Sequence, residues 1–145
     1  MDESIKSIVW NQFGASIDML INVVSNCPNN FFEQNPRFYY IAFHSTIFLD
    51  YYLTIPPSNF VPLLAFTTKE AKDRPKESIG DLIPDKVYDK QEVVDYLTKS
   101  REKCSLLIDS LTEERLTERF KEGDEPTDMD YSILEILLYN MRHTQ

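Results

Sequence analysis

The chain contains two histidines, and their surroundings make them the first candidates for chemistry. His44 lies within an almost wholly apolar and aromatic stretch, Phe38 to Leu53, and His143 follows an apolar run that begins at Ile133. Imidazole is the commonest metal ligand among protein side chains. A buried imidazole also needs a partner, because burying an unpaired polar group costs about 2–7 kcal/mol. The two histidines are therefore either metal ligands or core side chains that pair with a backbone carbonyl or a tyrosine hydroxyl.

Helical spacing places both histidines on interior faces, since side chains three and four residues apart share one face of a helix. His44 shares its face with Tyr40, Ile41, Ile47, Phe48 and Tyr51. His143 shares its face with Ile133, Ile136, Leu137 and Asn140. Sites in helical bundles are built from side chains on facing helices. We therefore expect the two imidazoles to share one interior site, although a catalytic zinc site uses three protein ligands.

Four stretches have the apolar periodicity of amphipathic helices and must position these side chains. They run from Glu3 to Asn26, from Pro36 to Leu53, from Asp89 to Leu111, and from near Thr127–Ser132 to Gln145. The third begins with a capping box formed by Asp89 and Glu92, and a short further helical turn is expected around Leu116 and Phe120. Residues 54–88 are rich in proline and are expected to be a long connection without strands that borders the site. The sequence predicts an all-α fold, a four-helix bundle that forms one domain over residues 1–145.

The composition excludes several classes of partner. The net charge of −9 argues against nucleic acid and anionic membrane surfaces. No run approaches the roughly 18 uncharged apolar residues that a membrane span needs. Cys27 and Cys104 form no metal motif, and the start Met-Asp-Glu has no signal-peptide character. A cytoplasmic protein with reduced cysteines is expected.

The segments AFHSTIFLDYYL and LLYNMRHTQ resemble the second and fourth helices of the DinB/YfiT-like metalloenzyme superfamily. The resemblance extends over nearly the whole chain, including the early helix with Trp10 and the long connection after the second helix. It implies a four-helix bundle of up-down-down-up topology, usually dimeric, that binds a divalent metal through three histidines. His44 matches the histidine of the second helix, and His143 matches the first histidine of a pair on the last helix.

The sequence departs from the family pattern at its end. The second histidine of the family's last-helix pair, with the Gly-Gln that follows it, would come after Gln145. We therefore expect a truncated last helix and an incomplete metal site. Asp50 and Glu135 share no helical face with the histidines and are expected to be poor replacements. Tyr139 and Asn140 flank His143 and are candidate supporting partners of that ligand, or else Asn140 fills a buried gap and Tyr139 is a packing side chain.

The resemblance implies a protein that binds zinc or nickel and transfers a low-molecular-weight thiol to small electrophiles. The alternative is a non-catalytic dimeric helical bundle that acts as a binding or stress-response module and whose histidines are structural. Phe38–Leu53 and Tyr131–Gln145 are apolar over more than one face, whereas a surface helix needs an apolar stripe only about 100° wide. The surplus predicts a homodimer with a two-fold interface.

Overall fold

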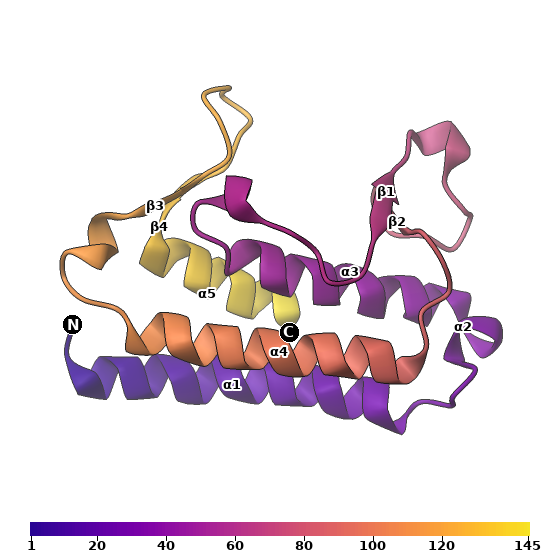
Figure 1. The fold of residues 1–145 in the computed structure, drawn as a ribbon, viewed down its shortest axis with the longest axis horizontal. Coiled ribbons are helices and arrows are strands. Elements are labelled where there is room, and N and C mark those ends of the chain that lie inside the picture. The colour runs from indigo at the N-terminus through magenta and orange to yellow at the C-terminus, as the bar shows by residue number, and fades with distance from the viewer.

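In the computed structural model, residues 1–145 form five α-helices and two short antiparallel hairpins (Figure 1). The helices are α1 (Glu3–Asn26), α2 (Phe31–Gln34), α3 (Pro36–Tyr52), α4 (Lys90–Asp109) and α5 (Ile133–Thr144). The strands are β1 (Phe66–Thr68), β2 (Leu82–Pro84), β3 (Arg119–Lys121) and β4 (Asp130–Ser132). The expected pure all-α four-helix bundle is therefore wrong, because the chain is a mixed fold with two small sheets.

The first hairpin lies in the connection for which no strands were expected. Strands β1 and β2 pair with Thr67 opposite Ile83, and the Thr67 hydroxyl donates to Asp85 Oδ1 at 2.6 Å. Leu82 and Ile83 are both buried, so the hairpin is held on the helices by apolar contacts. A strand of three residues is too short to show an alternating pattern, and the prolines around it favoured an irregular loop.

The short helical turn expected around Leu116 and Phe120 is present only at Leu116, and Phe120 lies in the second hairpin. A 3-10 turn at Arg115–Thr117 leads into β3, where Phe120 pairs with Tyr131 of β4. The Phe120 side chain is fully buried beside Tyr52 and Ile136. Helix α5 then begins at Ile133, where Ser132 and Glu135 form a capping box. The apolar spacing of Leu116 and Phe120 suits one helix as well as a turn followed by a strand, so spacing alone gave the wrong element for Phe120.

The long helices pair along their apolar stripes. Helix α1 packs along α4, and α3 packs along α5; α1 and α5 run in one direction and α3 and α4 in the other (Figure 1). Their stripes meet in one core that includes Phe13, Ile17, Leu97, Ile108 and Leu137. The capping box expected at the start of α4 is confirmed, with both Asp89–Glu92 hydrogen bonds present.

Helix α5 is much shorter than the helices that it contacts. It has 12 residues and α1 has 24, so at 1.5 Å per residue they are about 18 and 36 Å long. The C-terminal residue of the chain therefore lies midway along α1 (Figure 1). Side chains of α1 and α3, together with the end of α5, line a common cavity. None of the helices combines the length and hydropathy needed to cross a bilayer.

Candidate functional site

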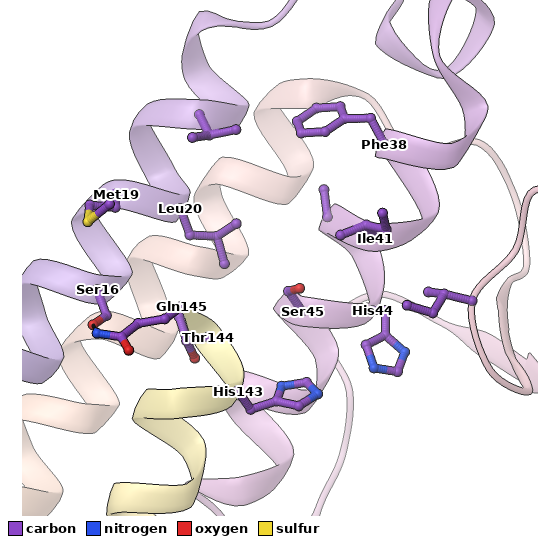
Figure 2. A pocket seen from close by; sticks show the side chains of 13 residues that line it. Ser16, Met19, Leu20, Phe38, Ile41, His44, Ser45, His143, Thr144 and Gln145 are labelled. Carbon is purple, nitrogen blue, oxygen red and sulfur yellow. Dashed lines mark hydrogen bonds between the residues drawn. The ribbon is translucent and has the colours of Figure 1, made fainter.

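The packing of α5 against α3 brings the two histidines together. The ring centres of His44 and His143 lie 5.4 Å apart, and Figure 2 shows the rings side by side at one end of a cavity. Phe48, one turn after His44 on α3, packs against both rings at 4.6 and 5.7 Å. The structure thus places the two predicted site residues in one cluster with an aromatic wall.

Both imidazoles have an unpaired buried nitrogen. Nδ1 of His44 and Nδ1 of His143 are buried, and no protein group forms a hydrogen bond with either atom. Burial lowers the pKa of both histidines. For His44 the neighbouring His143 lowers the pKa further, while Asp81 opposes the shift. Both rings are therefore favoured in the neutral form at neutral pH, which is the form that binds metals.

The lack of a protein hydrogen-bond partner bears on whether these histidines are metal ligands or paired core side chains. A core histidine was expected to pair with a backbone carbonyl or a tyrosine hydroxyl, and neither ring does so through Nδ1. An unsatisfied buried polar group costs about 1–3 kcal/mol, so native proteins contain few of them. Two such atoms in one cluster need a partner from outside the chain, such as water, an ion or a ligand.

The pair has the spacing to hold one ion. With metal–nitrogen bonds of about 2.0 Å, two rings on the same ion can have centres up to roughly 6 Å apart, and the observed separation is 5.4 Å. The chain supplies no third ligand here, since no cluster of three or more His, Cys, Asp or Glu side chains exists that could hold a metal. The residues present thus fit a divalent ion with two protein ligands rather than three.

The two carboxylates expected to be poor ligands have other partners. Asp50 accepts hydrogen bonds from Lys103 Nζ at 2.5 Å and from the Tyr96 hydroxyl at 2.6 Å. Glu135 accepts from the backbone N–H of Ser132 at 2.8 Å, as part of the capping box of α5. Both are therefore engaged away from the histidines.

Neither candidate supporting partner forms a hydrogen bond to His143. Asn140 is fully buried, and its Nδ2 donates to the carbonyl of Leu49 at 3.0 Å. Leu49 is among the last four residues of α3, where helix carbonyls have no partner further along the helix. Asn140 thus ties α5, which carries His143, to α3, which carries His44. Tyr139 stacks on His143 at 6.4 Å and an interplanar angle of 11°.

Sequence reasoning missed Gly80 and Asp81, which the first hairpin brings to His44. Gly80 has φ +64°, and a Cβ on it would lie 3.7 Å from His44 Cε1. The charge of Asp81 acts on the pKa of His44. A glycine followed by an acid is a turn signal that fits this position, but only the paired strands place it beside the histidine.

The histidines close one end of a cavity of about 590 Å³. Ser16, Ser45, Thr144 and Gln145 line the same end, and apolar side chains line the rest: Met19, Leu20, Val23, Phe38, Ile41, Ala42 and Ile79. Figure 2 shows the two ends, with His143 and Gln145 at one and Phe38 at the other. Ile79 comes from the connection between α3 and α4, which thus borders the site.

Comparison of the chain with protein-family models, with curated proteins and with solved structures finds no match. The resemblance to the DinB/YfiT-like superfamily therefore stays a prediction that the sequence segments carry. The chemistry of the site rests on the geometry described above.

Proposed function

We propose that this protein binds a divalent metal, zinc or nickel, through His44 and His143. Following the resemblance to DinB/YfiT-like proteins, we propose that it is a thiol-dependent transferase that acts on small electrophiles. One observation carries the proposal: two neutral imidazoles with unpaired buried Nδ1 atoms lie 5.4 Å apart at the end of a cavity. We also propose that the protein acts in the cytoplasm, where low-molecular-weight thiols are kept reduced.

The chain's own contribution is to hold and shield the site. When bound, a divalent ion supplies Lewis acidity that lowers the pKa of a thiol, so that the thiolate is present at neutral pH. His44 and His143 act as neutral ligands, and Phe48 and the apolar cavity walls limit the access of water. Two protein ligands leave the other positions of the ion to small molecules, which is what a transferase with a thiol and an electrophile requires.

Thermal unfolding with and without metal tests this proposal. Zn²⁺ or Ni²⁺ at about 100 times its Kd should raise Tm by roughly 5–10 °C for a chain of this size. His44→Leu and His143→Leu should each abolish the rise. Cys27→Ser is the matched control, because it removes the more exposed thiol and should leave the rise intact. Absence of a rise in the wild type, or an equal rise in His44→Leu, would contradict metal binding at this pair.

A second candidate function is the non-catalytic dimeric bundle, a binding or stress-response module with structural histidines. Exposed apolar surface on α1 favours it. Ile5, Ile8, Met19 and Val23 are all more than two-fifths exposed, which is surplus apolar area that a second copy can cover. Light scattering at micromolar concentration and moderate salt should give a dimer mass. A monomer mass would rule out the homodimer proposed here.

A further inference from the structure

A second cavity lies on the side of α3 that carries both hairpins (Figure 1). It has a volume of about 240 Å³, and its walls come from α3, the connection that follows, the first hairpin and Glu122, the residue after β3. None of its lining residues lines the cavity at the histidines, so the two spaces are separate. Sites for drug-sized ligands measure about 300–1,000 Å³, so this space suits a smaller molecule.

Aromatic rings line this cavity on more than one side. The half-buried side chains Phe48, Tyr51, Phe60 and Phe66 are all part of its wall. The ring of Tyr51 stands nearly at right angles to those of Phe48 and Phe60, with ring centres 5.9 and 5.2 Å apart. The face of an aromatic ring carries partial negative charge and attracts a cation that lies within about 6 Å of its centre. Several such rings around one space therefore favour a cationic ligand.

The charged side chains of the lining are all acidic. Asp81 and Glu122 line the cavity, and none of its other lining residues is Lys, Arg or His. Both carboxylates are exposed, and neither belongs to an ion pair within the chain. The net charge of −9 also raises the concentration of cations near the protein. The carboxylates and the aromatic faces thus favour the same kind of ligand.

Glu122 is held in position by neutral donors. Its Oε2 accepts from the Tyr51 hydroxyl at 2.6 Å, and its Oε1 accepts from the backbone N–H of Met129 at 2.9 Å. These bonds fix the carboxylate without neutralising its charge. Burial raises the pKa of Tyr51, and the hydrogen bond to Glu122 raises it further, so the hydroxyl keeps its proton at neutral pH. This part of the wall is therefore formed before a ligand arrives, which lowers the entropic cost of binding.

The lining fits a methylated ammonium better than a metal ion or a primary ammonium. Ca²⁺ and Mg²⁺ take about six or more oxygen ligands, and most of this wall is aromatic or aliphatic. A primary ammonium has three N–H donors that need acceptors, which such a wall does not supply. A quaternary ammonium has no N–H group, and its methyl groups make apolar contacts with the rings that attract its charge.

We propose that this cavity binds a small quaternary ammonium compound, with the methylated nitrogen between Tyr51 and Phe60 and its charge balanced by Asp81 and Glu122. The occupant is the free compound rather than a lipid head group or a phosphate ester, because the two carboxylates repel a neighbouring phosphate. This goes beyond the metal and the thiol proposed above, and it does not depend on the histidines.

Amide NMR titration of the metal-free protein, kept in a chelator, tests the proposal with four probes. Choline should bind saturably, with the largest shifts at cavity residues such as Thr68 and Leu82. The neutral analogue of choline, in which carbon replaces nitrogen, has the same shape and should bind at least about fivefold more weakly. Ethanolamine lacks the methyl groups and phosphocholine adds a phosphate, so both should bind more weakly than choline.

Each probe can overturn the proposal. The site is refuted if choline does not saturate, or if its largest shifts lie outside this cavity. Equally tight binding of the neutral analogue would mean that the ligand's charge makes no contribution. Equally tight binding of ethanolamine would contradict the preference for a methylated nitrogen, and equally tight binding of phosphocholine would contradict the repulsion by the carboxylates.

An aromatic variant tests the role of the rings. Phe60→Leu removes one aromatic face and keeps an apolar side chain, so choline should bind about two- to fivefold more weakly, while the neutral analogue should change little. A merely structural effect would weaken both ligands equally. Phe32→Leu is the matched control, because Phe32 is also half-buried and packs on another aromatic ring, Tyr39, but does not line the cavity. Wild-type choline binding by Phe60→Leu would remove this ring from the proposal.

A charge variant at an exposed position tests the role of the carboxylates. Asp81→Asn keeps the size of the side chain and removes one negative charge, so choline should bind about two- to threefold more weakly. The difference between choline and phosphocholine should narrow. Asp73→Asn is the matched control, because Asp73 is exposed between the same two strands and does not line the cavity. Equal effects of the two variants would assign the loss to the overall charge of the chain and contradict the site.

The result is independent of the metal proposal. Choline binding without metal-induced stabilisation keeps this inference and overturns metal binding at the histidines. Metal-induced stabilisation without choline binding does the reverse.

Discussion

Helix α3 carries two polar side chains less than two turns apart, the buried Asp50 and the half-buried His44, and their surroundings are opposite. Asp50 is 6% exposed, and its carboxylate accepts from Lys103 and Tyr96 of α4. Lys103 Nζ also donates to the Thr54 hydroxyl at 2.7 Å. His44 faces α5, and its buried Nδ1 has no partner. One group is fully paired within the chain and the other is not.

The difference separates a structural cluster from a candidate binding site. A paired buried group holds its elements together, and removing one partner is costly because the other stays buried without its bond. An unpaired buried group lowers stability and gains a partner only from outside the chain. The Asp50 cluster therefore joins α3 to α4, and the unpaired histidines are the basis of the ligand site that we propose.

The largest expected effect is on the Asp50 cluster. Asp50→Ala removes the carboxylate that accepts from Lys103 and Tyr96, and should lower the free energy of unfolding by about 2–4 kcal/mol. The loss should be smaller than for a fully buried pair, because the Lys103 side chain is 40% exposed and water partly screens its charge. Urea denaturation measures the change. Asp18→Ala is the control, since its pair with Arg101 is half-exposed and should contribute less than about 1 kcal/mol.

Asn140 should give the next largest effect. Asn140→Ala leaves the buried carbonyl of Leu49 without its donor, so the free energy of unfolding should fall by about 1–3 kcal/mol in the metal-free protein. Because the same bond joins the two helices that carry the histidines, metal affinity should fall as well. A loss of stability with unchanged metal affinity would show that the spacing of the pair does not depend on this bond.

The pH dependence of stability should report the histidines. Both have a pKa lowered in the folded protein from the ordinary 6.5, so the unfolded chain binds more protons below about pH 6.5. Stability should therefore be fully present above that pH and fall as the pH decreases through 6.5 toward the lowered folded pKa. The double variant His44→Leu with His143→Leu should flatten this part of the curve measured by urea denaturation. An unchanged slope would assign the effect to other groups.

The smallest expected effect is that of His44→Leu on the metal-free protein. The substitution removes an unpaired nitrogen and keeps a side chain of similar size against Phe48, so stability should change by less than about 1 kcal/mol. A structural histidine predicts a loss of about 1–3 kcal/mol instead. Urea denaturation of the two proteins in a chelator decides between the two functions proposed above.

The sequence was informative where periodicity and caps extend over several turns. The apolar spacing in Glu3–Asn26 and the Asp89–Glu92 capping box identify their helices directly. The meeting of His44 and His143 could also be predicted, because both lie on apolar faces that have to pack on another helix. Ser132 with Glu135 is a capping box that, in retrospect, marks the start of the last helix.

The rest depends on contacts between distant residues. The three-residue strands around Thr67 and Phe120 have no period of their own, and they form because the partner strand supplies the hydrogen bonds. The approach of Gly80 to His44 follows from that hairpin. Whether Nδ1 finds a partner is decided by a few ångströms of side-chain placement, which spacing along a helix does not specify.

Metal stoichiometry in a double-mutant series tests the central claim most directly. Calorimetric titration with Zn²⁺ should give one ion per chain in the wild type. His44→Leu, His143→Leu and the double variant should all lose binding to the same extent, because a shared ion needs both rings and the two losses are not additive. Independent partial losses, or one ion still bound to either single variant with wild-type affinity, would contradict a shared site.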